Sequence, residues 1–196
     1  MNSKIFIYGK HPVHAALTNA PQVVERVYVD PEQHQDIDAM AKKRNVFRMP
    51  FDEKFIEKKV GEDAVHQKVA AIVDVDKLMV DFHTFLESVR GKQRVAVALL
   101  AEIQDPQNVG SIIRSANAFG LSGVLIPKDR QAQITGAVIK ASVGCAFTIP
   151  LVAVGNVNQA VEELKSERFW VYGMSYYEGL PIYKGAMDTI VLLEPQ

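Results

Sequence analysis

The clearest hydropathy pattern in the chain is an apolar run at residues 95–103, a polar turn at 105–108, an amphipathic stretch and a second apolar run at 124–126. Nearly unbroken apolar runs are typical of strands that are covered on both faces of a sheet. We expect Asn108 to cap a helix that ends near Gly120. The pattern therefore predicts a βαβ unit, and ligands of such units bind at the carboxyl ends of the strands.

The rest of the chain also alternates between helical and extended patterns. Up to residue 76 we predict helices at 11–17, 32–44 and 51–60 and strands at 23–29, 46–47 and 68–75. After residue 94 we predict further helices at 134–143 and 156–165, strands at 147–154, 169–174 and 190–193, and a turn at 181–185. This alternation indicates the α/β class. We assign a small N-terminal α/β domain to 1–76, a linker to 77–93 and a second α/β domain to 94–196.

Composition restricts the kind of protein. The 196 residues carry a net charge of −1, so a nucleic-acid site would have to be a local basic patch. No apolar run reaches the roughly 18 residues of a membrane span, and the N-terminus lacks the apolar core of a signal peptide. Cys145 is the only cysteine, so we expect a reducing, cytoplasmic setting. We find no phosphate-binding glycine loop, nucleophile motif or metal-ligand cluster, and expect no metal.

The central helix places one cation away from its apolar side. At about 100° per residue, Arg114 points away from the stripe that we expect to be buried, formed by Ile112, Ile113, Ala116 and Phe119. Two interpretations stay open: a solvated arginine beside a capping asparagine, or a cleft in which the guanidinium meets an anion or a reacting hydroxyl. Phe169 and Trp170 begin a predicted strand, and we expect both in the core.

Two stretches are candidates for contact with RNA. Lys42, Lys43 and Arg44 form a basic cluster, although charge runs are usually solvated faces. The loop residues His66, Gln67 and Lys68 precede a strand, where they could touch RNA or simply close the loop.

Several segments together resemble one family. The sequence AEIQDPQNVGSIIRSANAFGLSGVLIP (101–127) closely resembles the first signature motif of the SpoU/TrmH RNA ribose 2′-O-methyltransferases. ITGAVIKASVGCAFTIPL (134–151) resembles the family's next segment. IYGKHPVHAAL (7–17) and HQKVAAIVDV (66–75) resemble the start and end of its substrate-binding domain. The resemblance covers essentially the whole chain and is nearest to the type that modifies 23S ribosomal RNA.

The resemblance implies an RNA-binding α/β domain joined to a Rossmann-like SPOUT methyltransferase domain with a C-terminal knot. It implies S-adenosylmethionine as methyl donor, a ribose 2′-O-methyl product and a homodimer. Asn108 and Arg114 match polar positions of the motif and would be catalytic. Arg114 would help to activate the 2′-hydroxyl or hold the adjoining phosphate, in its own site or in the partner's.

The chain departs from the family pattern in three places. A Gly-x-Glu-Gly motif would follow 190–193, where the chain has Glu194-Pro195-Gln196, and the third motif, with its Ser-Leu-Asn run, is not found. Lys68 stands where the family usually has glycine, which permits unusual φ angles. We therefore expect a truncated methyltransferase domain with an incomplete knot, and its donor-binding residues are unknown. Two hypotheses follow: a methyltransferase acting on ribosomal RNA, or a catalytically inactive remnant that binds RNA or dimerises.

Overall fold

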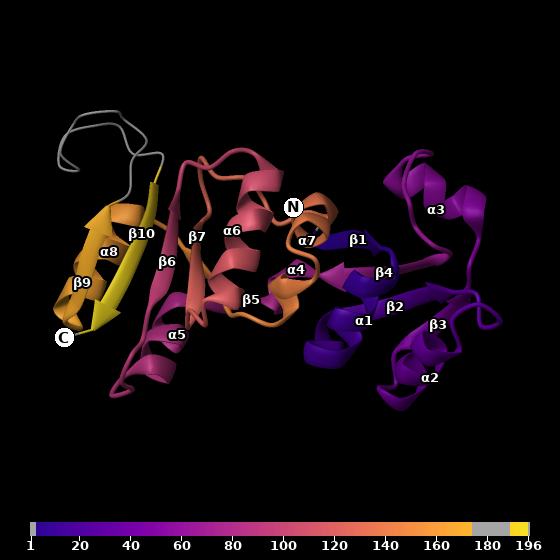
Figure 1. Ribbon diagram of the computed structural model, residues 1–196, viewed down its shortest axis with the longest axis horizontal. Helices are drawn as coiled ribbons and strands as arrows, with labels where there is room; N and C mark the ends of the chain where they lie inside the picture. Colours follow the sequence, from indigo (N-terminus) through magenta and orange to yellow (C-terminus); the bar gives the residue numbers. More distant parts are fainter. Residues whose placement is uncertain (1–2, 174–188, 196) are drawn as a thin grey trace. The chain divides into compact units, whose positions relative to one another are not determined.

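The computed structural model describes residues 3–173 and 189–195, and the chain divides into two compact units. Unit 1 comprises residues 1–78 and 134–148, and unit 2 comprises residues 79–133 and 149–196 (Figure 1). The predicted turn at 181–185 and the last residue of the predicted strand 169–174 lie outside the described residues. Within the described residues, no helix has the length and apolar character needed to cross a membrane.

Unit 1 is built on a four-stranded sheet in the order β1-β4-β2-β3. Its strands are β1 (Lys4–Tyr8), β2 (Val24–Val29), β3 (Phe47–Pro50) and β4 (Val69–Asp74). β4 is antiparallel to β1 and β2, whereas β3 runs parallel to β2 at the edge. The helical segments are α1 (Lys10–Asn19), η1 (Pro21–Val23), α2 (Gln35–Lys43), α3 (Glu53–Val60), α4 (Val75–Leu78), α7 (Gly136–Ala141) and η2 (Cys145–Phe147). The predicted alternation of the N-terminal part is therefore present, with shifted ends.

The two faces of the unit 1 sheet carry different helices. Ile56 of α3 packs with Tyr28 and Ala70 in one core cluster. Arg48 of β3 binds the Asp38 carboxylate of α2. Because neighbouring residues of a strand point to opposite faces, α2 lies on the face of the sheet opposite to α3. Figure 1 shows α3 on the opposite side of the sheet from α1 and α2.

Residues 134–148 pack with unit 1, although our sequence-based boundary placed them in the second domain. A Cβ atom at Gly136 would collide with the carbonyl oxygen of Phe6, so this glycine lets α7 approach β1. The Lys140 ammonium lies 5.1 Å from the ring centre of Tyr8. These close contacts come from chain segments that are far apart in sequence, which a boundary drawn in chain order cannot anticipate.

Unit 2 contains a six-stranded sheet in the order β5-β8-β7-β6-β10-β9. Its strands are β5 (Met79–Asp81), β6 (Val97–Ala101), β7 (Gly123–Pro127), β8 (Leu151–Val154), β9 (Phe169–Gly173) and β10 (Thr189–Pro195). β5, β8, β7 and β6 are parallel neighbours, which fits the expected Rossmann-like α/β class. The helices are α5 (Phe82–Val89), α6 (Pro106–Ala118) and α8 (Val157–Ser166).

The direction of β10 sets it apart from the parallel strands of the unit 2 sheet. Thr189 pairs with Ala101 and Leu193 with Val97, so β10 is antiparallel to β6. Its amino end, rather than its carboxyl end, lies beside the carboxyl end of β6. The expectation of an incomplete knot remains a prediction.

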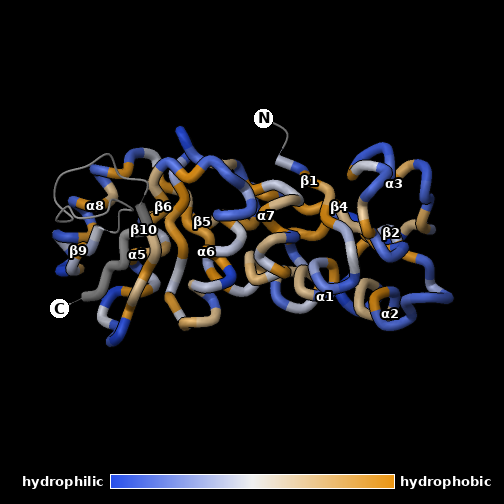
Figure 2. Tube along the Cα trace, turned by 45° about the horizontal axis from the view of Figure 1, so that its top comes forward, coloured by the Kyte–Doolittle hydropathy of each residue, from blue (hydrophilic) through white to orange (hydrophobic). Residues whose placement is uncertain are grey.

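Helices cover both faces of the unit 2 sheet. α5 and α8 share one core cluster with alternate residues of β6, β7 and β8. α6 packs against β6 and β7, is drawn beside β7 in Figure 1, and buries Val109, Ile113 and Ala116. Residues 79–89 differ from the predicted linker, because β5 pairs with β8 and α5 contributes Phe82, Phe85 and Leu86 to the core. In Figure 2 the orange, hydrophobic stretches follow the sheet strands β6 and β4, whereas α2 and α3 are largely blue.

Three local predictions need correction. Asn108 does not cap α6, because the helix begins at Pro106 and the Asp105 carboxylate accepts the N–H of Gln107. Phe119 is not in the buried stripe: it follows the last helical residue and is 83% exposed. Trp170 is 54% exposed, whereas Phe169 beside it is buried as expected, because alternate strand residues face opposite sides.

Candidate functional site

The carboxyl ends of β6 and β7 are joined by one buried side chain. Gln131, in the loop after β7, accepts the N–H of Ile103 through Oε1 at 2.9 Å and donates through Nε2 to the Ile103 carbonyl at 2.6 Å. Gln131 is only 7% exposed. The Ile103 carbonyl also accepts the N–H of Ala132. The two loops are thus held in one arrangement at the edge where α/β proteins bind ligands.

Backbone conformation and charge support the same arrangement. Glu102 and Arg130 both have positive φ angles, 58° and 54°, which are uncommon for residues other than glycine. Their side chains form an exposed ion pair at 3.5 Å. A contact of this kind between exposed groups contributes little stability, so the buried Gln131 amide is the main connection.

α6 starts beside these loops and presents Arg114 to solvent. Arg114 is exposed, and its side chain forms no hydrogen bond or ion pair with any described residue. α6 contains no acidic residue, so nothing within the helix compensates the guanidinium charge. The predicted orientation of Arg114 is confirmed, and the structure leaves it able to meet an anion.

Asn108 and Arg114 do not form one cluster on α6. They are six residues apart, which separates them by about 9 Å along the helix axis and about 120° around it. Asn108 is exposed in the first turn and has no hydrogen-bond partner among the described residues. These two side chains therefore do not hold one small group between them. Side chains on successive turns of the same helix face could do so.

In unit 1, His66, Gln67 and Lys68 form a tight turn with structural contacts. Gln67 and Lys68 have φ angles of 52° and 54°, and the N–H of Val69 bonds to the His66 carbonyl. Positive φ at both central positions characterises type I′ turns, which favour glycine and asparagine. The Gln67 side chain accepts the N–H of Lys10 at the start of α1. Lys68 thus occupies the left-handed conformation that a glycine would tolerate more easily.

His66 lies in an acidic environment. Potential ligand atoms of Glu53, Glu57 and His66 lie within 4.8 Å of one another, a grouping that our sequence analysis missed. His66 Nδ1 accepts the N–H of Lys68, so the proton of the neutral ring is on Nε2. Binding a metal through Nε2 would require that proton to leave and Nδ1 to become a donor. The arrangement therefore argues against a metal site, and the two glutamates disfavour phosphate at His66.

The basic cluster at the end of α2 is free of such competing contacts. Lys42 and Lys43 are in the last turn of α2, and Arg44 follows it. All three are exposed, and their side chains make no ion pair with a described residue. Cations at a helix C-terminus are favoured by the helix dipole, so both the structural and the RNA-binding interpretation fit this position.

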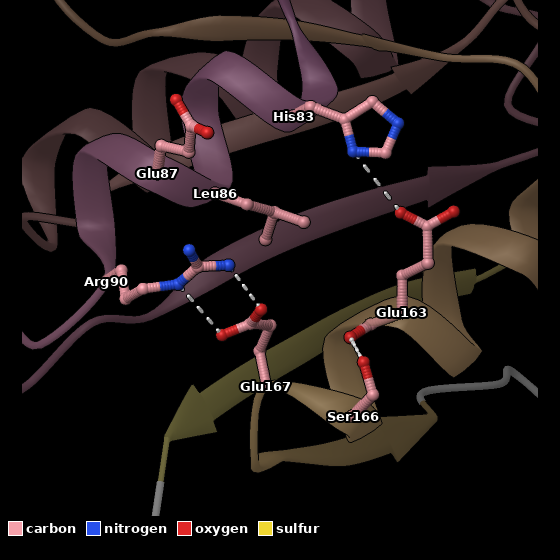
Figure 3. Close-up of a pocket in the computed structure, with 7 residues that line it drawn as sticks. All are labelled: His83, Leu86, Glu87, Arg90, Glu163, Ser166 and Glu167. Carbon is pink, nitrogen blue, oxygen red and sulfur yellow. Dashed lines mark hydrogen bonds and ion pairs between the residues drawn. The ribbon is translucent and has the colours of Figure 1, made fainter.

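A pocket in unit 2 lies between α5 and α8 (Figure 3). In this pocket Arg90 binds the Glu167 carboxylate through two hydrogen bonds, of 2.6 and 3.3 Å, and His83 lies 3.7 Å from Glu163. The hydrogen bond with Arg90 lowers the pKa of Glu167, and the same bond raises the pKa of Arg90. Since the cation is paired and three glutamates line the pocket, it is poorly suited to bind RNA. Its contacts instead join the two helices.

Sequence reasoning found Arg114 but missed the groups that organise its surroundings. Gln131 belongs to a polar loop without periodicity, and its partner Ile103 is 28 residues away. Asp105 could have been recognised as the cap, because Pro106 after it is well suited to the first helical position. Phe47 and Arg26 of unit 1 were also missed, since each sits in an ordinary strand pattern.

Comparisons with known proteins agree with this architecture. The profile described as "SpoU rRNA Methylase family" matches residues 95–193, and "RNA 2'-O ribose methyltransferase substrate binding" matches residues 6–78. A protein named "Putative TrmH family tRNA/rRNA methyltransferase" from Staphylococcus aureus (strain MSSA476) is 32% identical over 175 residues. That match covers 85% of this chain and 68% of the relative. The equally named protein of Staphylococcus haemolyticus is 32% identical over 174 residues, 86% of this chain and 68% of that protein.

Solved structures show the same fold at lower identity. The AdoMet-bound rRNA methyltransferase from Sinorhizobium meliloti superposes with a TM-score of 0.68 at 20% identity, covering 88% of this chain and 60% of that chain. The SpoU methyltransferase AviRb from Streptomyces viridochromogenes, in complex with AdoMet, gives 0.64 at 19% identity, covering 84% of this chain and 59% of that chain. The chain thus spans about 60% of the length of these solved neighbours.

The two units and their matches define the class as an RNA methyltransferase architecture, with a substrate-binding part and a methylase part. The chain belongs to the SpoU/TrmH family of RNA methyltransferases, as the resemblance implied. The two solved neighbours described above carry bound AdoMet, which is S-adenosylmethionine.

Proposed function

We propose that this protein transfers a methyl group from S-adenosylmethionine to a ribose 2′-hydroxyl of ribosomal RNA of the 23S type. The observation that carries the proposal is Arg114, an exposed guanidinium without a partner among the described residues. It lies on α6, which contains no acidic residue and begins beside the loops after β6 and β7. Gln131 joins these two loops. A cytoplasmic location is part of the proposal, since it would bring the protein together with ribosomal RNA.

Arg114 would act on RNA through charge and geometry. A guanidinium stays protonated at neutral pH, so Arg114 cannot take the proton of the 2′-hydroxyl as a general base. It can hold the adjoining phosphate through two parallel hydrogen bonds and stabilise negative charge that develops on the ribose oxygen. Asn108, with its free amide in the first turn of α6, would contribute a neutral contact. Fixing the ribose in the reactive orientation should supply much of the rate.

The described residues do not by themselves form a binding site for the methyl donor. In the described part of the chain, the buried side-chain atoms without a partner are His34 Nδ1 and Thr135 Oγ1, and neither belongs to the loops after β6 and β7. The amide of Gln131 is fully used by Ile103. We therefore assign no donor-binding residue and derive no step through the donor.

The basic cluster is the better of the two candidate RNA contacts. Lys42, Lys43 and Arg44 are exposed and unpaired among the described residues, so they can neutralise phosphates. In contrast, the Gln67 side chain is already bonded to α1, and His66 lies beside two glutamates. Lys68 remains a candidate only through its charge.

A homodimer is the assembly that best fits the spacing on α6. Because Asn108 and Arg114 are about 9 Å apart along the axis, they can serve two different sites, one in each subunit. Phe119, highly exposed at the end of the same helix, offers an apolar contact for a second copy.

A second candidate is a catalytically inactive protein that binds RNA or dimerises. The specific observation in its favour is the direction of β10, whose carboxyl end lies away from the loops after β6 and β7. Titration calorimetry with S-adenosylmethionine distinguishes the two candidates, because only the methyltransferase needs to bind the donor. Transfer of labelled methyl groups to ribosomal RNA completes the test. Donor binding with transfer supports the first proposal, whereas RNA binding with neither supports the second.

A further inference from the structure

An exposed aromatic ring follows the free basic cluster of unit 1 closely in the chain. Phe47, the first residue of the edge strand β3, is 58% exposed. Three residues earlier is Arg44, so β3 begins shortly after the cations at the end of α2. A large exposed apolar side chain on an edge strand that follows several unpaired cations in the chain is a candidate binding surface.

The ring is held in place from within the sheet. Arg26 of β2 is the direct neighbour of Phe47 in the strand register, and its guanidinium carbon lies 5.2 Å from the ring centre. Arg26 is itself fixed by a hydrogen bond of 3.4 Å to the hydroxyl of the buried Tyr28. The ring therefore has a defined orientation and one side against a cation, while much of its surface remains open to solvent.

Among the described residues, the charged group that contacts the ring is the cation Arg26. Asp38, the nearest acidic residue of α2, is occupied by Arg48 on the opposite face of the sheet. Glu53 and Glu57 gather instead around His66, which packs on Phe51. Phe51 follows Phe47 by four residues, a separation of about 13 Å along an extended chain. The acidic and the basic surfaces of unit 1 are thus at different ends of β3.

We propose that Phe47, supported by Arg26, stacks an unpaired RNA base, while Lys42, Lys43 and Arg44, at the end of α2 on the other face of the sheet, neutralise phosphates of the same RNA strand where it passes the edge strand β3. Flat aromatic rings beside basic residues are the usual means by which proteins hold single-stranded nucleic acid. A protein strand is the less suitable occupant of this edge. β3 is only four residues long and contains Arg48 and Pro50, features that discourage pairing with another strand. This inference rests on the proposed RNA substrate and specifies where and how unit 1 binds it.

The test compares two exposed aromatic residues in the full chain. Phe47→Leu keeps an apolar side chain but removes the ring, and Phe47→Trp restores an aromatic surface. Tyr172 in unit 2 is also 58% exposed, so Tyr172→Leu is the matched control. Binding is measured by fluorescence anisotropy with labelled single-stranded oligoadenylate and with a duplex RNA as the comparison probe.

We expect Phe47→Leu to weaken binding of the single strand by about ten-fold, with duplex binding unchanged. Phe47→Trp should restore the affinity, and Tyr172→Leu should have no effect. Lys43→Gln should reduce the slope of log affinity against log salt by about one unit.

Each other outcome overturns the inference in a recognisable way. Equal single-strand affinities of wild type and Phe47→Leu, with RNA binding intact, would reject the stacking site and leave the proposed function standing. An unchanged RNA affinity with altered self-association of Phe47→Leu in size-exclusion chromatography would identify a protein interface instead. Absence of RNA binding by the wild type would reject the proposed function as well.

Discussion

Replacement of Gln131 tests the connection between the two loops that border the candidate site. In Gln131→Ala, two hydrogen bonds to Ile103 are lost, of 2.9 and 2.6 Å. The Ile103 carbonyl keeps the N–H of Ala132, whereas the Ile103 N–H loses the partner shown in the structure. With about 1 kcal/mol for each bond and a further cost for the unpaired N–H, we expect unit 2 to lose about 2–3 kcal/mol.

Urea unfolding followed by fluorescence measures this loss. Trp170 is the only tryptophan and lies in β9 of unit 2, so the signal reports on the unit that contains Gln131. Gln133→Ala is the control, since it removes one exposed bond of 3.2 Å to the Lys128 carbonyl from the same loop. Its cost should stay below about 1 kcal/mol.

A third variant tests the donor and acceptor roles of the amide separately. Gln131→Glu can still accept the Ile103 N–H, but its second oxygen faces the Ile103 carbonyl, where an N–H donated before. We expect it to be at least as destabilising as Gln131→Ala at pH 7, and less so in acid, where the carboxyl can donate a proton. If Gln131→Ala and Gln133→Ala have the same stability, the buried amide does not connect the loops and our reasoning is refuted.

Three further predictions concern backbone, charge and surface. Lys68→Gly should stabilise unit 1 by about 0.5–1 kcal/mol in thermal unfolding because glycine accepts φ of 54°, and a gain from Lys68→Ala would contradict this. Asp81 accepts the N–H groups of Thr84 and His83 at the start of α5, and the Thr84 bond chiefly lowers its pKa. Its stabilisation should thus be present at neutral pH and fade as the pH falls below about 4, so the difference in urea unfolding between Asp81→Ala and wild type should be smaller at pH 3 than at pH 7, and an equal or larger difference at pH 3 would contradict this. Phe119→Ser should change the stability of the monomer by less than about 0.5 kcal/mol while weakening any dimer in analytical ultracentrifugation, and a large stability loss would mean that the ring is packed.

Patterns within the chain predicted the elements better than their spatial relations. The helix predicted at 156–165 is present as α8, and Asn156 caps it, with its side chain accepting the N–H of Gln159; a cap and its helix are neighbours in sequence. The orientation of Arg114 followed from the helical period alone. Phe119 was misplaced because the same period was extended past the last turn of α6.

Relations between distant segments were not predictable in this way. An apolar strand does not encode the direction in which it pairs, so the antiparallel β10 could not be foreseen. Likewise, nothing in the polar loop marks Gln131 as the partner of Ile103, because such a contact depends on how β6 and β7 align. Arg26 and Phe47 meet for the same reason, through the register of β2 and β3.

The most direct test of the central claim is methyl transfer to ribosomal RNA by wild type, Arg114→Ala and Lys165→Ala. Lys165 is a suitable control because it is an exposed cation on α8, which covers the other face of the same sheet. We predict that Arg114→Ala lowers kcat/KM on the order of 100-fold while its unfolding and donor binding match the wild type, and that Lys165→Ala is unaffected. Full activity of Arg114→Ala would contradict the account.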